Sequence, residues 1–146
     1  MTLLDSLQKR VNFLNEVIEA LRLNGIRAVH ARAEDGARQQ DLRERFDVAV
    51  SRAVAALPVL AEYCLPYVKI GGSFLSYKGS GAEAETEAAR GAVRRLGGEI
   101  AELTVFELPG ADGEKLGRSL IRIAKTAATP KKYPRKAGTA STSPLT

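Results

Sequence analysis

Charged side chains directly follow several apolar segments of this sequence. Asp5 follows TLL, Ala33 and Glu34 stand just after IRAVHA, Arg52 follows FDVAVS, and Lys78 ends SFLSYK. An acid can accept hydrogen bonds from both hydroxyls of a ribose, as acids do in nucleotide-binding folds. Backbone N–H groups and an acceptor can bind an adenine, and an arginine suits a phosphate or a carboxylate. The pattern indicates a ligand with a nucleoside and an ionised group.

Each of these residues also has a purely structural interpretation. Asp5 could cap a helix that begins near Leu7, and Ala33 and Glu34 could lie in a solvated loop. Arg52 could form a structural salt bridge. Lys78 could meet an RNA phosphate, or it could lie along the sheet edge with its ammonium in water. The sequence leaves these alternatives open.

The elements that must position these residues alternate along the chain. Apolar runs predict strands over 2–6, 26–31, 46–51 and 73–78. Three- and four-residue spacing and composition predict helices over four segments: 6–23, 33–45, 58–68 and 82–97. Alternating strands and helices favour a parallel sheet with helices on both faces. Ligands of such sheets bind beyond the carboxyl ends of the strands, where the charged residues lie.

The last part of the chain departs from this alternation. EIAELTVFEL (99–108) and SLIRIAK (119–125) predict two strands joined as a hairpin by PGADGEK, which adds an antiparallel edge. Residues 126–146 have no periodicity. All 17 acidic residues lie within 1–114, whereas 115–146 hold eight Lys and Arg, four of them in KKYPRK. A basic end on an acidic body suggests a polyanionic partner, although a solvated tail is the alternative.

Composition excludes several classes of protein. The chain is 45% apolar and 27% charged, the balance of a soluble globular domain. It has no run of 18 apolar residues and no secretion signal, so we expect a cytoplasmic protein without membrane contact. One cysteine, Cys64, and one histidine, His30, argue against a disulfide or a zinc site. We therefore expect no metal.

The sequence resembles a known family through motifs that occur in order. They are TLLDSLQKRVNFL, ARAED, FDVAVSRAVA, YCLPYVKIGGSFLSYKG and TPKKYPRKAG, and together they cover nearly the whole chain. They are similar to the small-subunit ribosomal RNA guanine-N7 methyltransferase family G, also called glucose-inhibited division protein B. The resemblance implies a Rossmann-like class I methyltransferase fold. It also implies S-adenosylmethionine as cofactor and 16S rRNA or a small-subunit precursor as partner.

The resemblance also implies roles for individual residues. Asp5, Ala33, Glu34 and Arg52 stand where the family contacts the cofactor. A second set matches basic positions suited to RNA: Lys9, Lys78, Lys131, Lys132, Arg135 and Lys136. Methyl transfer to guanine N7 needs no general base, so we expect no catalytic residue beyond those that position the reactants. Tyr133 could stack on a base or pack against the protein.

One part of the family pattern does not occur in this sequence. The family carries N-terminal helices, a first strand and a Gly-rich loop before TLLDS. We therefore interpret 1–125 as a partial methyltransferase domain starting at its second strand, and 126–146 as a basic C-terminal tail. Because the first strand lies in the middle of the family's sheet, we expect a gap and unpaired backbone. A truncated gene product or a mis-assigned start codon would explain the pattern.

Three functions remain on the sequence alone. The first is an rRNA methyltransferase, possible only with the missing region. The second is a non-catalytic RNA-binding remnant of such an enzyme. The third is a nucleotide-binding α/β domain unrelated to RNA, which TPKKYPRKAG argues against. In the first two cases KKYPRKAG is expected to fold back toward the strand carboxyl ends and hold rRNA phosphates.

Overall fold

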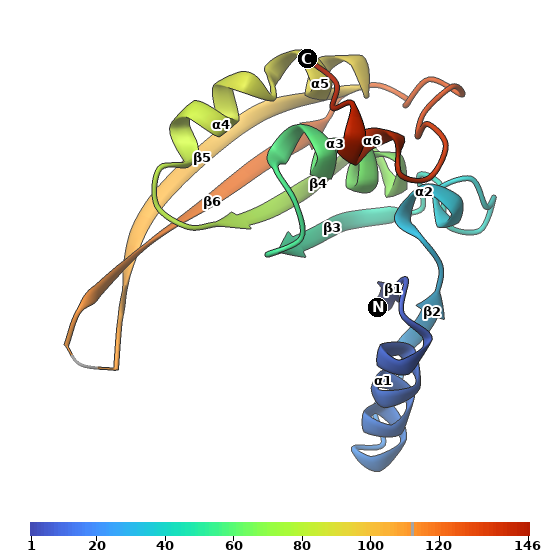
Figure 1. Cartoon of the computed structure of the whole chain (residues 1–146). Coiled ribbons are helices and arrows are strands. Elements are labelled where there is room, and N and C mark those ends of the chain that lie inside the picture. Colours follow the sequence, from blue (N-terminus) through green and yellow to red (C-terminus); the bar gives the residue numbers. More distant parts are fainter. Residues whose placement is uncertain (112) are drawn as a thin grey trace.

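The computed structural model describes residues 1–111 and 113–146. Strands and helices alternate as far as β4, and a long hairpin and a C-terminal segment follow (Figure 1). The elements are β1 Thr2–Asp5, α1 Gln8–Ala20, β2 Arg27–His30, α2 Ala33–Gly36, β3 Phe46–Arg52, α3 Leu57–Cys64, a 3-10 turn Leu65–Tyr67, β4 Val68–Lys78, α4 Ala82–Ala88, α5 Arg90–Arg95, β5 Gly98–Pro109, β6 Lys115–Lys125 and α6 Thr139–Thr142.

All six predicted strands are present, but three local predictions were wrong. The helix predicted over 33–45 is only α2, because the chain then forms turns and Glu44 has a left-handed φ of 52°. The helix predicted over 82–97 is divided into α4 and α5 at Ala89. Gly72 lies within β4 instead of in a turn before it. A Cβ there would overlap the carbonyl oxygen of Asp47, so glycine permits the close approach of β3 and β4.

The strands form two separate sheets. β1 pairs with β2 in parallel, and a four-stranded sheet has the order β3-β4-β6-β5. β3 and β4 are parallel, whereas β6 is antiparallel to both β4 and β5, which confirms the antiparallel edge. Within the described chain, β1 and β3 each have one paired neighbour. The expected gap in the sheet is therefore confirmed.

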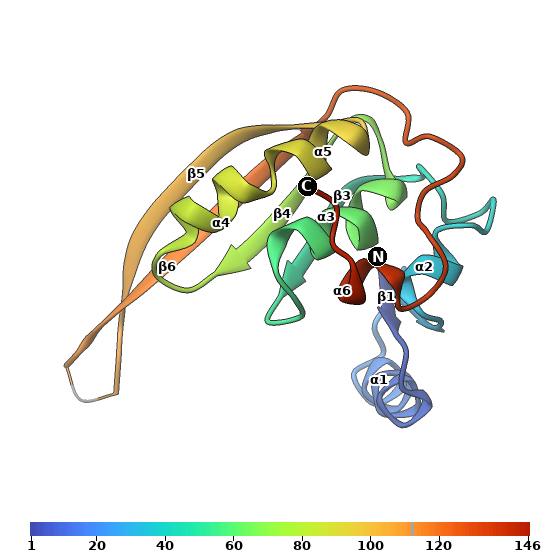
Figure 2. The ribbon, with the colours of Figure 1, turned by 45° about the horizontal axis from the view of Figure 1, so that its top comes forward.

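The described helices α3, α4 and α5 lie on one face of the four-stranded sheet, and α1 packs on the β1–β2 pair (Figures 1 and 2). Phe74, Ile121 and Ile123 point toward α3 and α5 and are fully buried. The expectation of helices on both faces is thus not met for this sheet. Strand alternation places Val48 and Val50 on the opposite face, where both are exposed.

Candidate functional site

The predicted ligand residues lie at strand ends, as expected, but on two different sheets. Asp5 ends β1, and Ala33 begins α2 shortly after β2. Arg52 ends β3 and Lys78 ends β4. The described chain has no strand that joins β1 to β3, so the two halves of the candidate edge are not linked through the sheet.

Asp5 connects the end of β1 to the start of α1. Its Oδ1 accepts a hydrogen bond from the Leu7 N–H at 2.8 Å, and its Oδ2 lies 3.3 Å from Arg10 Nη1. The capping role considered from the sequence is not met, because Leu7 occupies the N-cap position of α1 and no side chain caps the helix. The side chain is still 24% exposed, so the carboxylate keeps lone pairs that a ribose hydroxyl could reach.

Ala33 and Glu34 are held by distant parts of the chain. The Tyr67 hydroxyl donates to the Ala33 carbonyl oxygen at 2.7 Å. Glu34 is buried, and its Oε1 accepts from the Gly138 N–H at 2.8 Å. In this structure the Glu34 carboxylate therefore holds the C-terminal segment and does not face open space.

Arg52 and Lys78 have contrasting surroundings. Arg52 is exposed, and its guanidinium makes no hydrogen bond or ion pair within the described residues. Lys78 donates to the Ala55 carbonyl oxygen at 2.7 Å and to Glu85 Oε1 at 2.8 Å, and Glu85 Oε1 also accepts from the Leu57 N–H at 2.6 Å. Lys78 thus ties the loop after β3 to α4, whereas Arg52 remains available to an anion.

Residues 126–146 are packed on the body through a set of contacts that we call the C-terminal clamp. Its centre is Glu62 of α3, which is fully buried. Glu62 accepts hydrogen bonds from the backbone N–H of Arg135 at 2.7 Å and from its guanidinium at 2.6 to 3.1 Å. These bonds raise the pKa of the Arg135 guanidinium. Arg135 is therefore occupied by Glu62 and is not free for RNA in this conformation.

A second part of the clamp lies between α2 and β3. The Arg43 guanidinium donates to the backbone carbonyls of Thr129, Tyr133 and Ala37 at 2.8, 2.9 and 3.2 Å. A buried carbonyl without a donor is costly, so these bonds fix the path of the segment.

The third part of the clamp is an ion pair. Glu44 Oε1 accepts from the Thr129 N–H at 2.7 Å and lies 3.1 Å from Lys125 Nζ. Burial alone would raise the pKa of Glu44, but these bonds outweigh it and lower the pKa. Burial lowers the pKa of Lys125, and Glu44 opposes that effect. The pair links the end of β6 to the turn before β3.

The clamp leaves three lysines of KKYPRKAG in solvent. Lys131, Lys132 and Lys136 are exposed. Tyr133 is only 7% exposed, which confirms packing instead of stacking on a base. Lys132 Nζ lies 5.3 Å from the centre of its ring. The segment is thus not a loose tail, because the clamp fixes its backbone. Only some of its basic side chains, the three lysines, are exposed to a binding partner. Lys9, the remaining RNA candidate, is exposed on α1.

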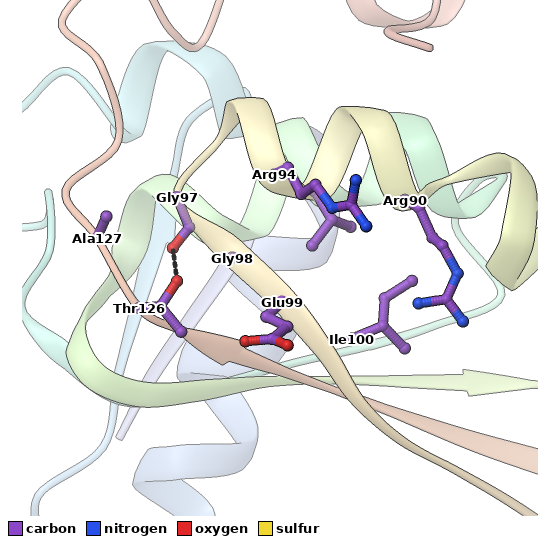
Figure 3. A pocket seen from close by; sticks show the side chains of 9 residues that line it. Arg90, Arg94, Gly97, Gly98, Glu99, Ile100, Thr126 and Ala127 are labelled. Atoms are coloured by element: carbon purple, nitrogen blue, oxygen red, sulfur yellow. Dashed lines mark hydrogen bonds between the residues drawn. The ribbon is translucent and has the colours of Figure 1, made fainter.

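A cavity of about 300 Å³ lies at a different place, beside the amino end of β5 (Figure 3). Arg90 and Arg94 of α5 and Glu99 of β5 line it, and the Thr126 hydroxyl donates to the Gly97 carbonyl oxygen at its rim at 3.4 Å. None of the predicted ligand residues lines this cavity. It is not the candidate site.

Other kinds of chemistry find little support in the described part of the chain. Burial raises the pKa of the Cys64 thiol to about 12, so it is a poor nucleophile at neutral pH. Among residues 1–111 and 113–146, no three His, Cys, Asp or Glu side chains are grouped to hold a metal ion. No helix in these ranges is long and apolar enough to cross a membrane.

The fold belongs to the Rossmann-like α/β class of S-adenosylmethionine-dependent methyltransferases. M. jannaschii TYW2, solved in complex with AdoMet, superposes with a TM-score of 0.62 at 14% identity over 85% of this chain and 57% of that one. A SAM-dependent methyltransferase from Methanosarcina mazei gives 0.57 at 14% identity over 86% and 82%. At such low identity the likeness concerns the fold alone.

Within this class, the chain belongs to the GidB family, described as rRNA small subunit methyltransferase G, which residues 1–110 match. It is 48% identical over 145 residues to the ribosomal RNA small subunit methyltransferase G of Clostridium perfringens, and 53% identical over 144 residues to that of Acetivibrio thermocellus. These matches cover 99% of this chain but only 59% and 58% of the relatives. The family resemblance is confirmed.

The residues present fit the cofactor only in part. Asp5 and Arg52 retain exposed polar atoms, whereas Glu34 is bonded to Gly138. No sequence pattern indicated the Glu62–Arg135 and Glu34–Gly138 pairs, because their members lie 73 and 104 residues apart. The only available signal for such a pair was Glu62, an acid on the buried face of α3, since a buried carboxylate needs a partner.

Proposed function

We propose that this chain contributes part of an enzyme that transfers a methyl group from S-adenosylmethionine to guanine N7 of 16S rRNA in the cytoplasm. The observation that carries the proposal is the 48% identity to an rRNA small subunit methyltransferase G over nearly the entire chain. Because the chain spans 59% of that relative, the activity requires the region outside the match. Asp5 and Arg52 would hold the cofactor, with the backbone of Ala33 beside them.

The proposed chemistry agrees with the residues present. S-adenosylmethionine supplies an electrophilic methyl group, and guanine N7 carries a lone pair and no proton. The transfer therefore needs correct placement of the two reactants and no general base, and placement can lower a barrier by up to roughly 7–11 kcal/mol. Lys131, Lys132 and Lys136, whose backbone the C-terminal clamp holds, would orient the rRNA that receives the methyl group.

The alternative is a non-catalytic RNA-binding remnant of the family. The bond from Gly138 to Glu34 favours it, because that bond occupies one of the four expected cofactor residues. The clamp and its exposed lysines would remain functional in such a protein. The two proposals differ in what the chain should bind. Part of a methyltransferase should bind the cofactor, whereas a non-catalytic remnant should bind RNA but not the cofactor.

Calorimetric titration with S-adenosylmethionine tests the cofactor site. We expect saturable binding, weakened at least about tenfold in Asp5→Ala and in Arg52→Ala, because each loses a charged partner of the cofactor. Asp41→Ala and Arg95→Ala are matched controls with exposed side chains away from the strand ends. Absence of binding by the folded wild-type chain would reject the cofactor site and leave the RNA-binding alternative.

RNA binding is tested by its dependence on salt. We expect the Gln variant of Lys131, Lys132 and Lys136 to bind a 16S rRNA fragment less tightly, with a log–log salt slope shallower by about 2, since each phosphate contact contributes roughly 0.7–0.9. The control replaces Arg90, Arg94 and Arg95 of α5 by Gln, which removes the same charge elsewhere. Equal slopes for the two variants would show that net charge alone drives binding.

A further inference from the structure

The loop that joins β3 to α3, residues 53–56, begins with a residue in a strained backbone conformation (Figure 1). Ala53 has a φ of 54°, in the left-handed region that favours glycine. A residue with a Cβ atom keeps such a conformation only where the surrounding structure enforces it, and conformations of this kind are frequent at functional sites. Val54, the next residue, is 65% exposed. Burial of that side chain therefore does not enforce the strained conformation.

Two charged side chains from neighbouring elements hold the far end of this loop. The Lys78 ammonium, at the end of β4, donates to the Ala55 carbonyl oxygen at 2.7 Å and to Glu85 Oε1 at 2.8 Å. The same oxygen of Glu85, on α4, accepts from the Leu57 N–H at 2.6 Å. Leu57 is the first residue of α3, which has no side-chain cap of its own, so Glu85 satisfies a free N–H of that helix from a distance.

The Lys78–Glu85 ion pair lies deeper than an ordinary surface pair. Its side chains are 14% and 29% exposed, whereas those of Lys69 and Asp47 on the same sheet are 50% and 79% exposed. Exposed pairs contribute little to stability, but a partly buried pair that also bonds to backbone groups fixes the elements that it joins. The Lys78 ammonium, which the sequence suggested for an RNA phosphate, uses two of its three N–H donors within the protein.

Arg52 stands between two parts of the backbone that are both fixed. It is paired with Tyr77 of β4 on one side, and the strained Ala53 follows it directly. Its guanidinium is exposed and makes no hydrogen bond or ion pair within the described residues. A fixed backbone with a free guanidinium suits an arginine that binds an anion, because less conformational freedom is lost when the ligand binds.

We propose that Lys78 and Glu85 are positioning residues, which hold the 53–56 loop and the carboxyl end of β3 so that Arg52 is oriented for the ionised group of its ligand. Lys78 acts through Ala55, Glu85 acts through the N-terminus of α3, and neither contacts the ligand. The inference rests on the proposed function in one respect, because it takes the ligand of Arg52 to be S-adenosylmethionine. The holding of the loop is a property of the chain without ligand.

Trypsin cleavage of the ligand-free 146-residue chain tests whether the loop is held. In Lys78→Met, cleavage of the Arg52–Ala53 bond should be at least about fivefold faster than in the wild type, because a released loop enters the protease more often. Glu85→Ala should have a similar effect. The control is Lys69→Met, which removes a lysine of the same strand from its exposed pair with Asp47 and should leave this cleavage unchanged. Circular dichroism establishes that each variant is folded.

Calorimetric titration with S-adenosylmethionine tests whether the held loop serves Arg52. Lys78→Met should weaken binding at least about tenfold in the wild-type background but less than about threefold in the Arg52→Ala background, because the ammonium acts through Arg52. A general loosening of the fold would instead reduce affinity by the same factor in both backgrounds. Lys69→Met should bind as the wild type does.

Two results would overturn the proposal. The first is unchanged cleavage at Arg52 in Lys78→Met, which would mean that the ammonium does not hold the loop. The second is an equal loss of affinity in the two backgrounds, which would mean that Lys78 contacts the ligand itself or acts only on overall stability. If the folded wild-type chain binds no S-adenosylmethionine, the proposed cofactor site fails, and the cleavage rates still decide whether Lys78 and Glu85 hold the loop.

Discussion

Glu62→Gln is expected to lower the free energy of unfolding by about 3 kcal/mol, because removing one member of a buried ion pair leaves the other without compensation. Arg135 would lose the charge that faces its guanidinium, and its side chain is only 25% exposed. Its backbone N–H would retain only a weaker, neutral acceptor. Urea denaturation followed by circular dichroism measures the change.

The control for this prediction is Glu87→Gln, which removes the partner of Arg90 in an exposed ion pair. Such pairs contribute about 0–1 kcal/mol, so we expect a small effect. Trypsin cleavage after Lys131 and Lys132 should also accelerate in the Glu62 variant, because the clamp no longer fixes the segment. Equal stability of the two variants would mean that the Glu62–Arg135 pair does not hold the C-terminal segment.

Arg43→Ala is expected to lower the free energy of unfolding by about 2–3 kcal/mol. The variant leaves the carbonyls of Thr129, Tyr133 and Ala37 without their donor, and a hydrogen bond to a charged group contributes roughly 1.5–3 kcal/mol. Arg43→Lys should recover only part of the loss, since an ammonium lacks the planar fork that reaches several carbonyls. Thermal and urea denaturation measure both variants.

Arg45→Ala serves as control for this second prediction. Arg45 is exposed and donates one hydrogen bond, to the Gln40 carbonyl oxygen at 3.1 Å. Its loss should change stability by less than about 1 kcal/mol. Full recovery of stability by Arg43→Lys would show that charge matters at this position and that the geometry of the guanidinium does not.

The class of fold and the order of the elements could be predicted from the residues alone. Strands such as FDVAVS are rich in apolar and β-branched residues, which is typical of parallel sheets, and that composition is visible without coordinates. The three- and four-residue spacing of apolar residues likewise predicted α1, since one helical face must be apolar. The motifs from TLLDS to TPKKYPRKAG indicated the family, which the matches confirmed.

How the candidate residues are used became clear from the folded chain and not from its sequence. KKYPRKAG reads as a basic tail, yet Arg135 is bound by Glu62, Gly138 donates to Glu34, and Tyr133 is buried. No local pattern encodes these contacts, because each joins residues far apart in the chain and depends on how α2 and α3 are placed. Burial of a carboxylate requires a partner, and only folding determines which basic or backbone group becomes that partner.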